Sequence, residues 1–119
     1  MTQENKDLLF KDLCARLPYD VFVNINGVKC VLQPHDISDL IKCDVDIKPY
    51  LFPLSSMTEE QKEEFNTKSF ELQLKVINDE IMYEKATEFE VDFYNKHHLD
   101  WRGLIEKGLA IDATDKNIY

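Results

Sequence analysis

An Asn-Gly pair between two runs of alternating apolar residues is the feature that most constrains this chain. The runs span residues 21–25 and 28–32, on either side of Asn26 and Gly27. Asn-Gly suits a two-residue type I′ turn, in which both central residues have positive φ. The pattern therefore predicts a β-hairpin with one apolar face. The predicted cross-strand pairs are Ile25 with Val28, Val23 with Cys30, Val21 with Leu32, Phe22 with Val31 and Asn24 with Lys29.

The segments around the hairpin predict one helix and one further strand. Apolar residues at helical spacing indicate a helix over about residues 4–17, which Pro18 ends because it disfavours helical backbone before it. After the hairpin, Gln33-Pro34-His35-Asp36 interrupts the strand. Alternation from Asp44 to Lys48 predicts a third strand ending at Pro49, and residues 50–54 are expected to form an apolar connection between two prolines.

The second half of the chain starts with a capping signal. Thr58 and Gln61 have the spacing of a capping box, which predicts a helix to about Lys68. Residues 70–76 then alternate and predict a half-buried strand. From residue 86 to 98 a strand period and a helix period compete, and the length of the segment favours a helix.

The C-terminal segment predicts short elements. Residues 104–107 suggest a helical turn with Gly108 as its left-handed cap, and residues 109–111 could add an edge strand. The polar tail after about residue 112 is expected to be loose. Together these elements predict one α+β domain over residues 1–119, with a small antiparallel sheet, led by the hairpin, packed against two or three helices.

Composition limits the classes of function. The chain has 119 residues, 44% of them hydrophobic, which is enough for a core without disulfides or metal. Its net charge is −9, of which residues 58–119 carry −7, so we expect no direct binding to nucleic acid or to an anionic membrane. The longest apolar runs are too short to span a membrane, and the polar N-terminus lacks the apolar stretch of a signal peptide.

The three cysteines indicate a reducing compartment. Cys14, Cys30 and Cys43 are odd in number and form no CxxC pair, so we expect idle or buried thiols. Cys14 is expected on the apolar stripe of the first helix and Cys30 on the inner face of the hairpin. The predicted location is the cytoplasm, bacterial or of an infected host.

Three segments carry a resemblance to a known group of proteins. They are Asp12 to Tyr19, Asp46 to Glu60 and Asp92 to Ala110, the last containing the run Asp-Trp-Arg-Gly-Leu-Ile-Glu-Lys-Gly. In these segments the chain resembles short hypothetical proteins carried by phages, prophages and genomes of gut Bacteroidetes. The residue before Arg102 is usually Tyr in that group and is Trp101 here. The resemblance implies a phage or mobile-element context and supplies no catalytic residue, ligand or mechanism.

No motif in the sequence predicts a catalytic residue, a cofactor or a metal. Adjacent helical residues diverge by about 100°, so His97 and His98 cannot readily share one ion. Cys30, His35 and Cys43 have no metal-site spacing, and HExxH is absent. The cysteines lack a predicted base beside them, and the three isolated glycines form no phosphate-binding loop.

The segment from His97 to Arg102 is the candidate partner-binding site. His97, His98, Trp101 and Arg102 concentrate two imidazoles, an indole and a guanidinium in an acidic half-chain. Trp and Arg dominate interface hot spots, and a cationic island can orient a partner. The alternative is a structural corner in which Trp101 is a core anchor and Arg102 pairs with a carboxylate.

The function predicted from the sequence is that of a non-enzymatic phage or mobile-element accessory protein that acts by binding another protein. One alternative is an acidic inhibitor that mimics nucleic acid, although interspersed lysines would interrupt its negative strip. A second alternative is a small enzyme with an unrecognised site. The oligomeric state stays open. The acidic residues of the possible mimic are Glu59, Glu60, Glu63, Glu64, Glu84, Glu88, Glu90 and Asp92.

Overall fold

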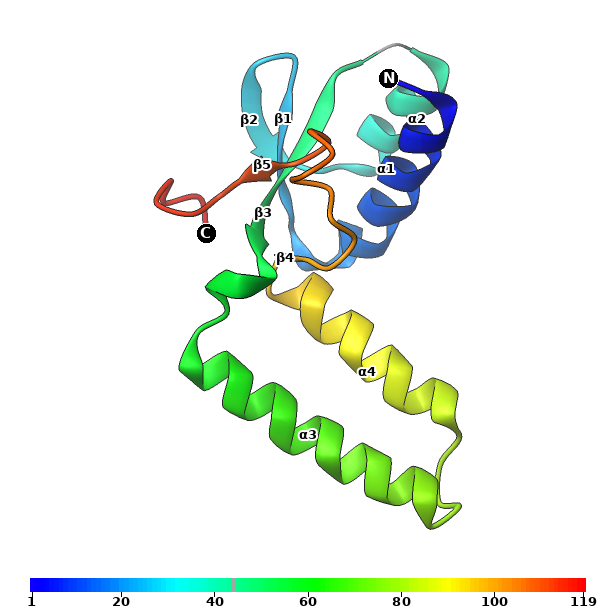
Figure 1. The fold of residues 1–119 in the computed structure, drawn as a ribbon. Helices are drawn as coiled ribbons and strands as arrows, with labels where there is room; N and C mark the ends of the chain where they lie inside the picture. The colour runs from blue at the N-terminus through cyan, green and yellow to red at the C-terminus, as the bar shows by residue number, and fades with distance from the viewer. Residues whose placement is uncertain (44) are drawn as a thin grey trace.

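The structure is a computed structural model that describes residues 1–43 and 45–119, and its fold is α+β as predicted (Figure 1). A sheet and two helices form a body, and a second pair of helices extends from it. In chain order the elements are α1 (Gln3–Arg16), a 3-10 turn (Leu17–Tyr19), β1 (Phe22–Ile25), β2 (Val28–Val31), α2 (Pro34–Lys42), β3 (Ile47–Pro53), a second 3-10 turn (Leu54–Ser56), α3 (Glu59–Ile77), α4 (Tyr83–Lys96), β4 (Leu99–Asp100) and β5 (Ile111–Asp112).

The β-hairpin is confirmed, with all four of its pairs between Phe22↔Val31 and Ile25↔Val28 in the predicted register. Asn26 and Gly27 have φ of 50° and 92°, as a type I′ turn requires. The apolar inner face of the hairpin is buried away from the turn, where Val23 is fully covered. Beside the turn, the first residues of β2 are exposed to solvent. The local chemistry of two residues therefore sets the register of β1 and β2.

The sheet is mixed, with the strand order β2-β1-β3-β4 and with β5 also beside β3. β1 is antiparallel to β2 and β3, but β4 and β5 run parallel to β3. The predicted antiparallel pairing is confirmed for the hairpin and for the β1–β3 pair. The two parallel strands are only two residues long, and they bring the C-terminal segment of the chain back to the body.

The prediction that the third strand ends at Pro49 is wrong. β3 continues to Pro53, and Leu51, which was expected in the apolar connection after the strand, is fully buried within it. Asn26 N donates to Asp46 O at 3.0 Å, so these two residues form a hydrogen-bonded pair of the antiparallel ladder. Because such pairs alternate with non-hydrogen-bonded ones, Pro49, opposite Val23, is in a non-hydrogen-bonded pair and owes β1 no N–H. A proline at such a position does not interrupt the ladder. Asp44, part of the predicted alternation, lies outside the described residues.

Helix α2 was not predicted. The Gln33-Pro34-His35-Asp36 segment does end the strand, but it also starts a helix: Pro34 occupies the first turn, and Gln33 N donates to Asp36 Oδ2 at 2.8 Å. A carboxylate at this position accepts a backbone N–H that the helix leaves unpaired. Ile37 and Leu40 then pack into the core.

The predicted strand over residues 70–76 is wrong, because α3 continues as one helix to Ile77. Its start is confirmed, since Gln61 N donates to Thr58 Oγ1 at 3.1 Å and Thr58 N donates to Gln61 Oε1 at 3.0 Å. The helix predicted over residues 86–98 is also confirmed as α4. The apolar alternation in α3 thus distributes Phe70 to one side of a helix and Leu72 to the other.

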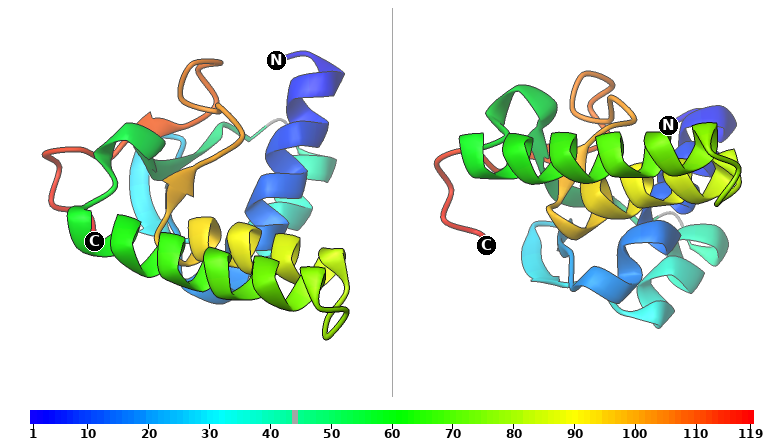
Figure 2. Two further views of the ribbon diagram at one scale, coloured as in Figure 1. Left: turned by 60° about the horizontal axis from the view of Figure 1, so that its bottom comes forward. Right: turned by 90° about the horizontal axis from the view of Figure 1, so that it is seen from below.

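The hydrophobic core lies in the body, between the sheet, α1, α2 and the segment 104–110. α3 and α4 form an antiparallel pair that extends beyond this body, with α3 as its outer layer (Figure 2). The molecule is accordingly elongated, with extents of 49 × 30 × 23 Å. Within residues 1–43 and 45–119 no helix is both long and apolar enough to cross a membrane.

The C-terminal segment is anchored to the sheet. Gly108 caps the turn at φ 71° as predicted, and β5 begins at Ile111 rather than at residue 109. The tail was expected to be loose, but the hydroxyl of Tyr119 donates to Tyr50 O at 2.7 Å and accepts from Phe22 N at 3.0 Å. This one side chain ties the end of the chain to β1 and β3.

Candidate functional site

The turn that holds the predicted site joins the helical pair to the body. α4 ends at Lys96, and His97 N donates to Phe93 O at 3.1 Å. His98 has φ 58°, a left-handed conformation that reverses the chain direction. β4 then pairs in parallel with the end of β3. The segment is therefore a corner that positions α4 against the sheet.

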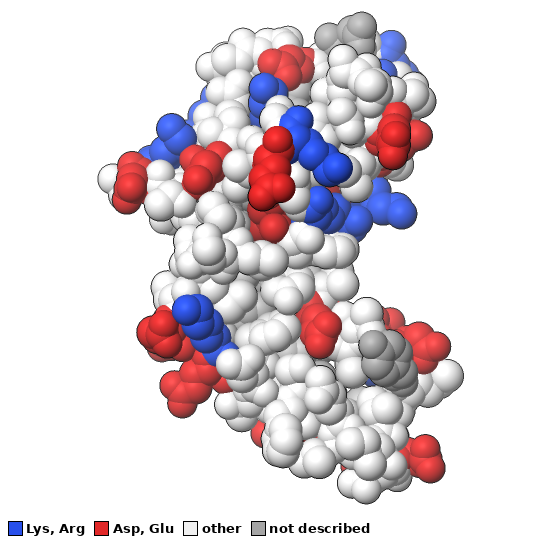
Figure 3. Space-filling model, in the orientation of Figure 1, with Lys and Arg blue, Asp and Glu red and all other residues white. Residues whose placement is uncertain are grey.

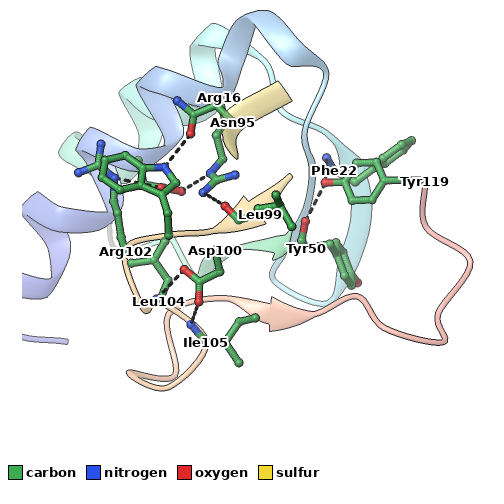
Figure 4. A network of polar contacts seen from close by, with 12 residues as sticks. Arg16, Phe22, Tyr50, Asn95, Leu99, Asp100, Arg102, Leu104, Ile105 and Tyr119 are labelled. Atoms are coloured by element: carbon green, nitrogen blue, oxygen red, sulfur yellow. Dashed lines mark hydrogen bonds and ion pairs between the residues drawn. The ribbon is translucent and has the colours of Figure 1, made fainter. Parts of the chain in front are cut away.

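Trp101 and Arg102 contact each other and the body. The Arg102 guanidinium lies 4.0 Å from the centre of the Trp101 ring, and Arg102 Nε donates to Asp12 Oδ1 at 3.2 Å. Trp101 Nε1 donates to the buried Asn95 at 3.0 Å. Only 16% of the Arg102 side chain is exposed. These contacts belong to the polar network at the corner (Figure 4).

A buried ion pair lies beneath this corner and was not predicted. Asp12 and Arg16, four residues apart on α1, have fully covered side chains and are joined at 2.8 Å. Arg16 Nη2 donates to Leu99 O at 2.7 Å, and Asp12 also accepts from Arg102. Figure 4 shows Arg16 beside Leu99. The two charges share a face of α1 with Leu9 and Leu13, a pattern from which the pair could have been inferred.

The two histidines are half-buried, and both pKa values are lowered. Burial lowers the pKa of His97, whose Nδ1 lies 3.3 Å from Gln61 Nε2. Burial, followed by the charge of Arg16, lowers the pKa of His98 to about 4, and its ring stacks on Tyr119 at 3.8 Å. Both imidazoles are therefore neutral at pH 7, so the predicted cationic island is reduced to Arg102.

The contacts around the turn resemble those expected if the segment is a structural corner, which was the alternative to a partner-binding site. Trp101 is half-buried and Arg102 is tied to a carboxylate. Asp100 is buried too, and its carboxylate accepts from Leu104 N at 2.8 Å and Ile105 N at 2.9 Å, which orders the following turn. A partner-binding role for His97, His98, Trp101 and Arg102 stays a prediction.

The cysteines do not form a site in the described part of the chain. Cys14 is exposed, so the prediction that it lies on the apolar stripe of α1 is wrong: that stripe consists of Leu9 and Leu13 with the ion pair. Cys43 is exposed and Cys30 is half-buried, and burial raises the pKa of the Cys30 thiol. Among the described residues, no three His, Cys, Asp or Glu side chains are grouped to hold a metal ion.

The outer face of α3 is a second candidate surface. The helix contains no fully buried residue, since its inner face is only half-covered by α4. Phe65 makes that contact through ring pairs with Phe89, Phe93 and Tyr94 at 5.2–6.0 Å. The opposite side holds a row of exposed residues, here called the outer seam. The outer seam consists of Glu60, Glu63, Thr67, Phe70, Leu74 and Ile77.

The outer seam changes character along its length. Phe70, Leu74 and Ile77 are 63%, 43% and 75% exposed. The other end is acidic and borders a surface hollow of about 490 Å³. The residues around the hollow are Glu60, Glu63, Glu64, Thr67, Lys68 and Glu71.

The helical pair carries most of the excess negative charge. Residues 59–96 hold 11 acidic and 5 basic side chains, a balance of −6 out of −9 for the whole chain. Acidic groups gather along the edges of this pair around a broad uncharged surface, in the lower half of Figure 3. Ion pairs Lys62–Glu59 and Lys68–Glu71 interrupt the strip of α3 that a nucleic-acid mimic would use.

Comparisons with protein families, curated proteins and solved structures find no match to this chain.

Proposed function

We propose that this protein is a non-enzymatic accessory protein that acts in the cytoplasm by binding another protein, and that the outer seam of α3 is its binding surface. One observation carries the proposal. Phe70, Leu74 and Ile77 are exposed at successive seam positions of a helix that buries no residue fully. Contiguous exposed apolar residues rimmed by polar ones are typical of interaction surfaces.

The rest of the molecule supports a scaffold role for the body. Several polar groups at its corner make internal hydrogen bonds: Arg16 donates to Leu99 O, Trp101 to Asn95 and Arg102 to Asp12. The setting we propose is a phage or mobile element, as the resemblance implies, and a reducing cytosol suits the exposed thiols of Cys14 and Cys43.

Site-specific photo-cross-linking tests the proposal in cells that encode the protein. A benzophenone side chain replaces Leu74 in one variant and Ile41, an equally apolar exposed residue of α2, in the control. We expect position 74 to form a covalent adduct with a second polypeptide and position 41 to form none. Equal adducts at both positions, no adduct at position 74, or an adduct with a second copy of the chain alone would contradict the proposal.

A further inference from the structure

We infer that the partner of the outer seam is a basic amphipathic helix, whose Lys and Arg side chains lie against the acidic end of the seam and whose apolar side chains lie against the other end. This inference rests on the proposed function and names the chemistry of the partner. It is carried by the spacing, the exposure and the charge of the seam residues.

The spacing of the seam is that of a helix-packing surface. Its six positions follow one another at intervals of 3, 4, 3, 4 and 3 residues, all of them exposed. Residues repeating every 3.5 positions form the contact row between two helices that pack along each other. The seam runs over most of the 19 residues of α3. A second helix is the element that can follow such a row along its whole length.

The charge of the seam gives the partner its polarity. Glu59 is paired with Lys62 at 3.2 Å, and Glu71 with Lys68 at 3.7 Å. By contrast, among the described residues no basic side chain lies within ion-pair distance of Glu60, Glu63 or Glu64. Glu60 and Glu63 occupy one end of the row, with Glu64 beside them on the flank of the helix, and the apolar residues occupy the other end. A complementary helix is therefore basic at one end and apolar at the other.

A second copy of the chain does not fit the seam. In a parallel pair, Glu60 and Glu63 of one copy would lie against the same carboxylates of the other, and like charges oppose such contact. In an antiparallel pair, the carboxylates would lie against Leu74 and Ile77, which would remove them from water without a partner. Two helical pairs of net charge −6 would also repel each other.

The test is a titration of the full chain with three synthetic peptides of 21 residues. The first is an amphipathic helix with Lys at the seam-facing positions of one half and Leu at those of the other half. The second replaces each Lys by Glu, and the third shuffles the first peptide so that its composition is kept and its amphipathic pattern is lost. Fluorescence anisotropy of labelled peptide measures each Kd at two salt concentrations.

We expect the full chain to bind the Lys/Leu peptide at least about tenfold more tightly than either other peptide. Two pairs of substitutions should weaken that binding: Glu60→Gln with Glu63→Gln, which should also reduce the salt dependence, and Leu74→Gln with Ile77→Gln. Matched controls make the same changes elsewhere on the surface. They are Glu4→Gln with Glu106→Gln, and Val28→Gln with Ile41→Gln, all at exposed residues.

Equal binding of the Lys/Leu peptide and the shuffled peptide, or equal losses in the seam variants and their controls, would overturn the inference, because attraction would then be non-specific. Sedimentation that shows a dimer lost in the Leu74→Gln, Ile77→Gln variant would overturn it in favour of self-association. If position 74 cross-links to a different protein but the chain binds the three peptides equally, the proposed function stands and this inference alone is contradicted. Thermal melts of every variant show whether folding is retained.

Discussion

Asp12 and Arg16 place two charged side chains in the interior of the body, where they form an ion pair at 2.8 Å. Asp12 accepts from Arg16 and Arg102, and Arg16 also donates to Leu99 O. Among the described residues Arg16 Nη1 has no hydrogen-bond partner, and Asp12 is the carboxylate paired with the guanidinium. An arrangement of this kind specifies how α1 docks against β4, although its net contribution to stability can be small.

We expect Asp12→Asn to lower the free energy of unfolding by about 3–5 kcal/mol, because it leaves the buried charge of Arg16 uncompensated. Urea denaturation monitored by circular dichroism measures the loss. The control is Asp7→Asn, at an exposed residue about one and a half turns away on the same helix. It should lower the free energy of unfolding far less. A similar small loss in both variants would show that water reaches Arg16.

The hydroxyl of Tyr119 has a separate role from its ring. Tyr119→Phe keeps the stack on His98 but removes the bonds to Phe22 N and Tyr50 O. We expect a loss of about 1 kcal/mol in the free energy of unfolding. Tyr94→Phe, which removes a hydroxyl from the helical pair, should be nearly neutral. Equal effects would mean that the tail does not hold the sheet edge.

The lowered pKa of His98 makes stability depend on pH. Its pKa is about 4 in the folded chain and 6.5 in the unfolded one, so the unfolded state binds more protons between these values. The contribution is fully present above pH 6.5 and is lost as pH falls toward 4. We expect His98→Asn, which tolerates the left-handed backbone, to flatten the stability curve in this window. An unchanged slope in urea denaturations at pH 4.5 and 6.5 would assign the pH dependence to another group.

At the scale of single elements, the hairpin turn depends on the backbone freedom of one residue. Gly27 has φ 92°, and a Cβ added there would meet no atom of the described residues within 4 Å. We expect Gly27→Val to cost on the order of 1 kcal/mol or more through backbone strain alone. Thermal or urea unfolding measures the loss, and Gly27→Asn should lose less because Asn tolerates positive φ. Equal losses would point to a cause other than the turn.

For the whole molecule, we expect the helical pair to open independently of the body. The core cluster lies in the body, whereas α3 has no fully buried residue. Local opening free energies follow buried apolar contact, so amides of α3 should exchange with solvent through a less costly opening than those of β1 and β3. Native-state hydrogen exchange resolved by NMR measures both. Identical opening free energies would show one cooperative unit and contradict this expectation.

Sequence patterns predicted the elements that depend on neighbouring residues. The Asn26-Gly27 turn, the Thr58–Gln61 capping box and the Gly108 cap all follow from the backbone preferences and hydrogen bonds of residues at most three apart. The α+β class follows from the sum of such elements. Local interactions of this kind act in the unfolded chain as in the folded one, so they can be read before the fold is known.

Only the tertiary structure determined what packs against the segments whose sequence pattern was ambiguous. Alternation over residues 70–76 describes a strand only if another strand pairs with it. With α4 alongside, the same residues continue a helix and leave Phe70 and Leu74 exposed on the outer seam. The same holds for the candidate turn. From the sequence, Arg102 could have faced a partner protein, but in the fold its Nε lies 3.2 Å from Oδ1 of Asp12, 90 positions away in the chain. Contacts between distant segments determine burial, and burial cannot be read from either segment alone.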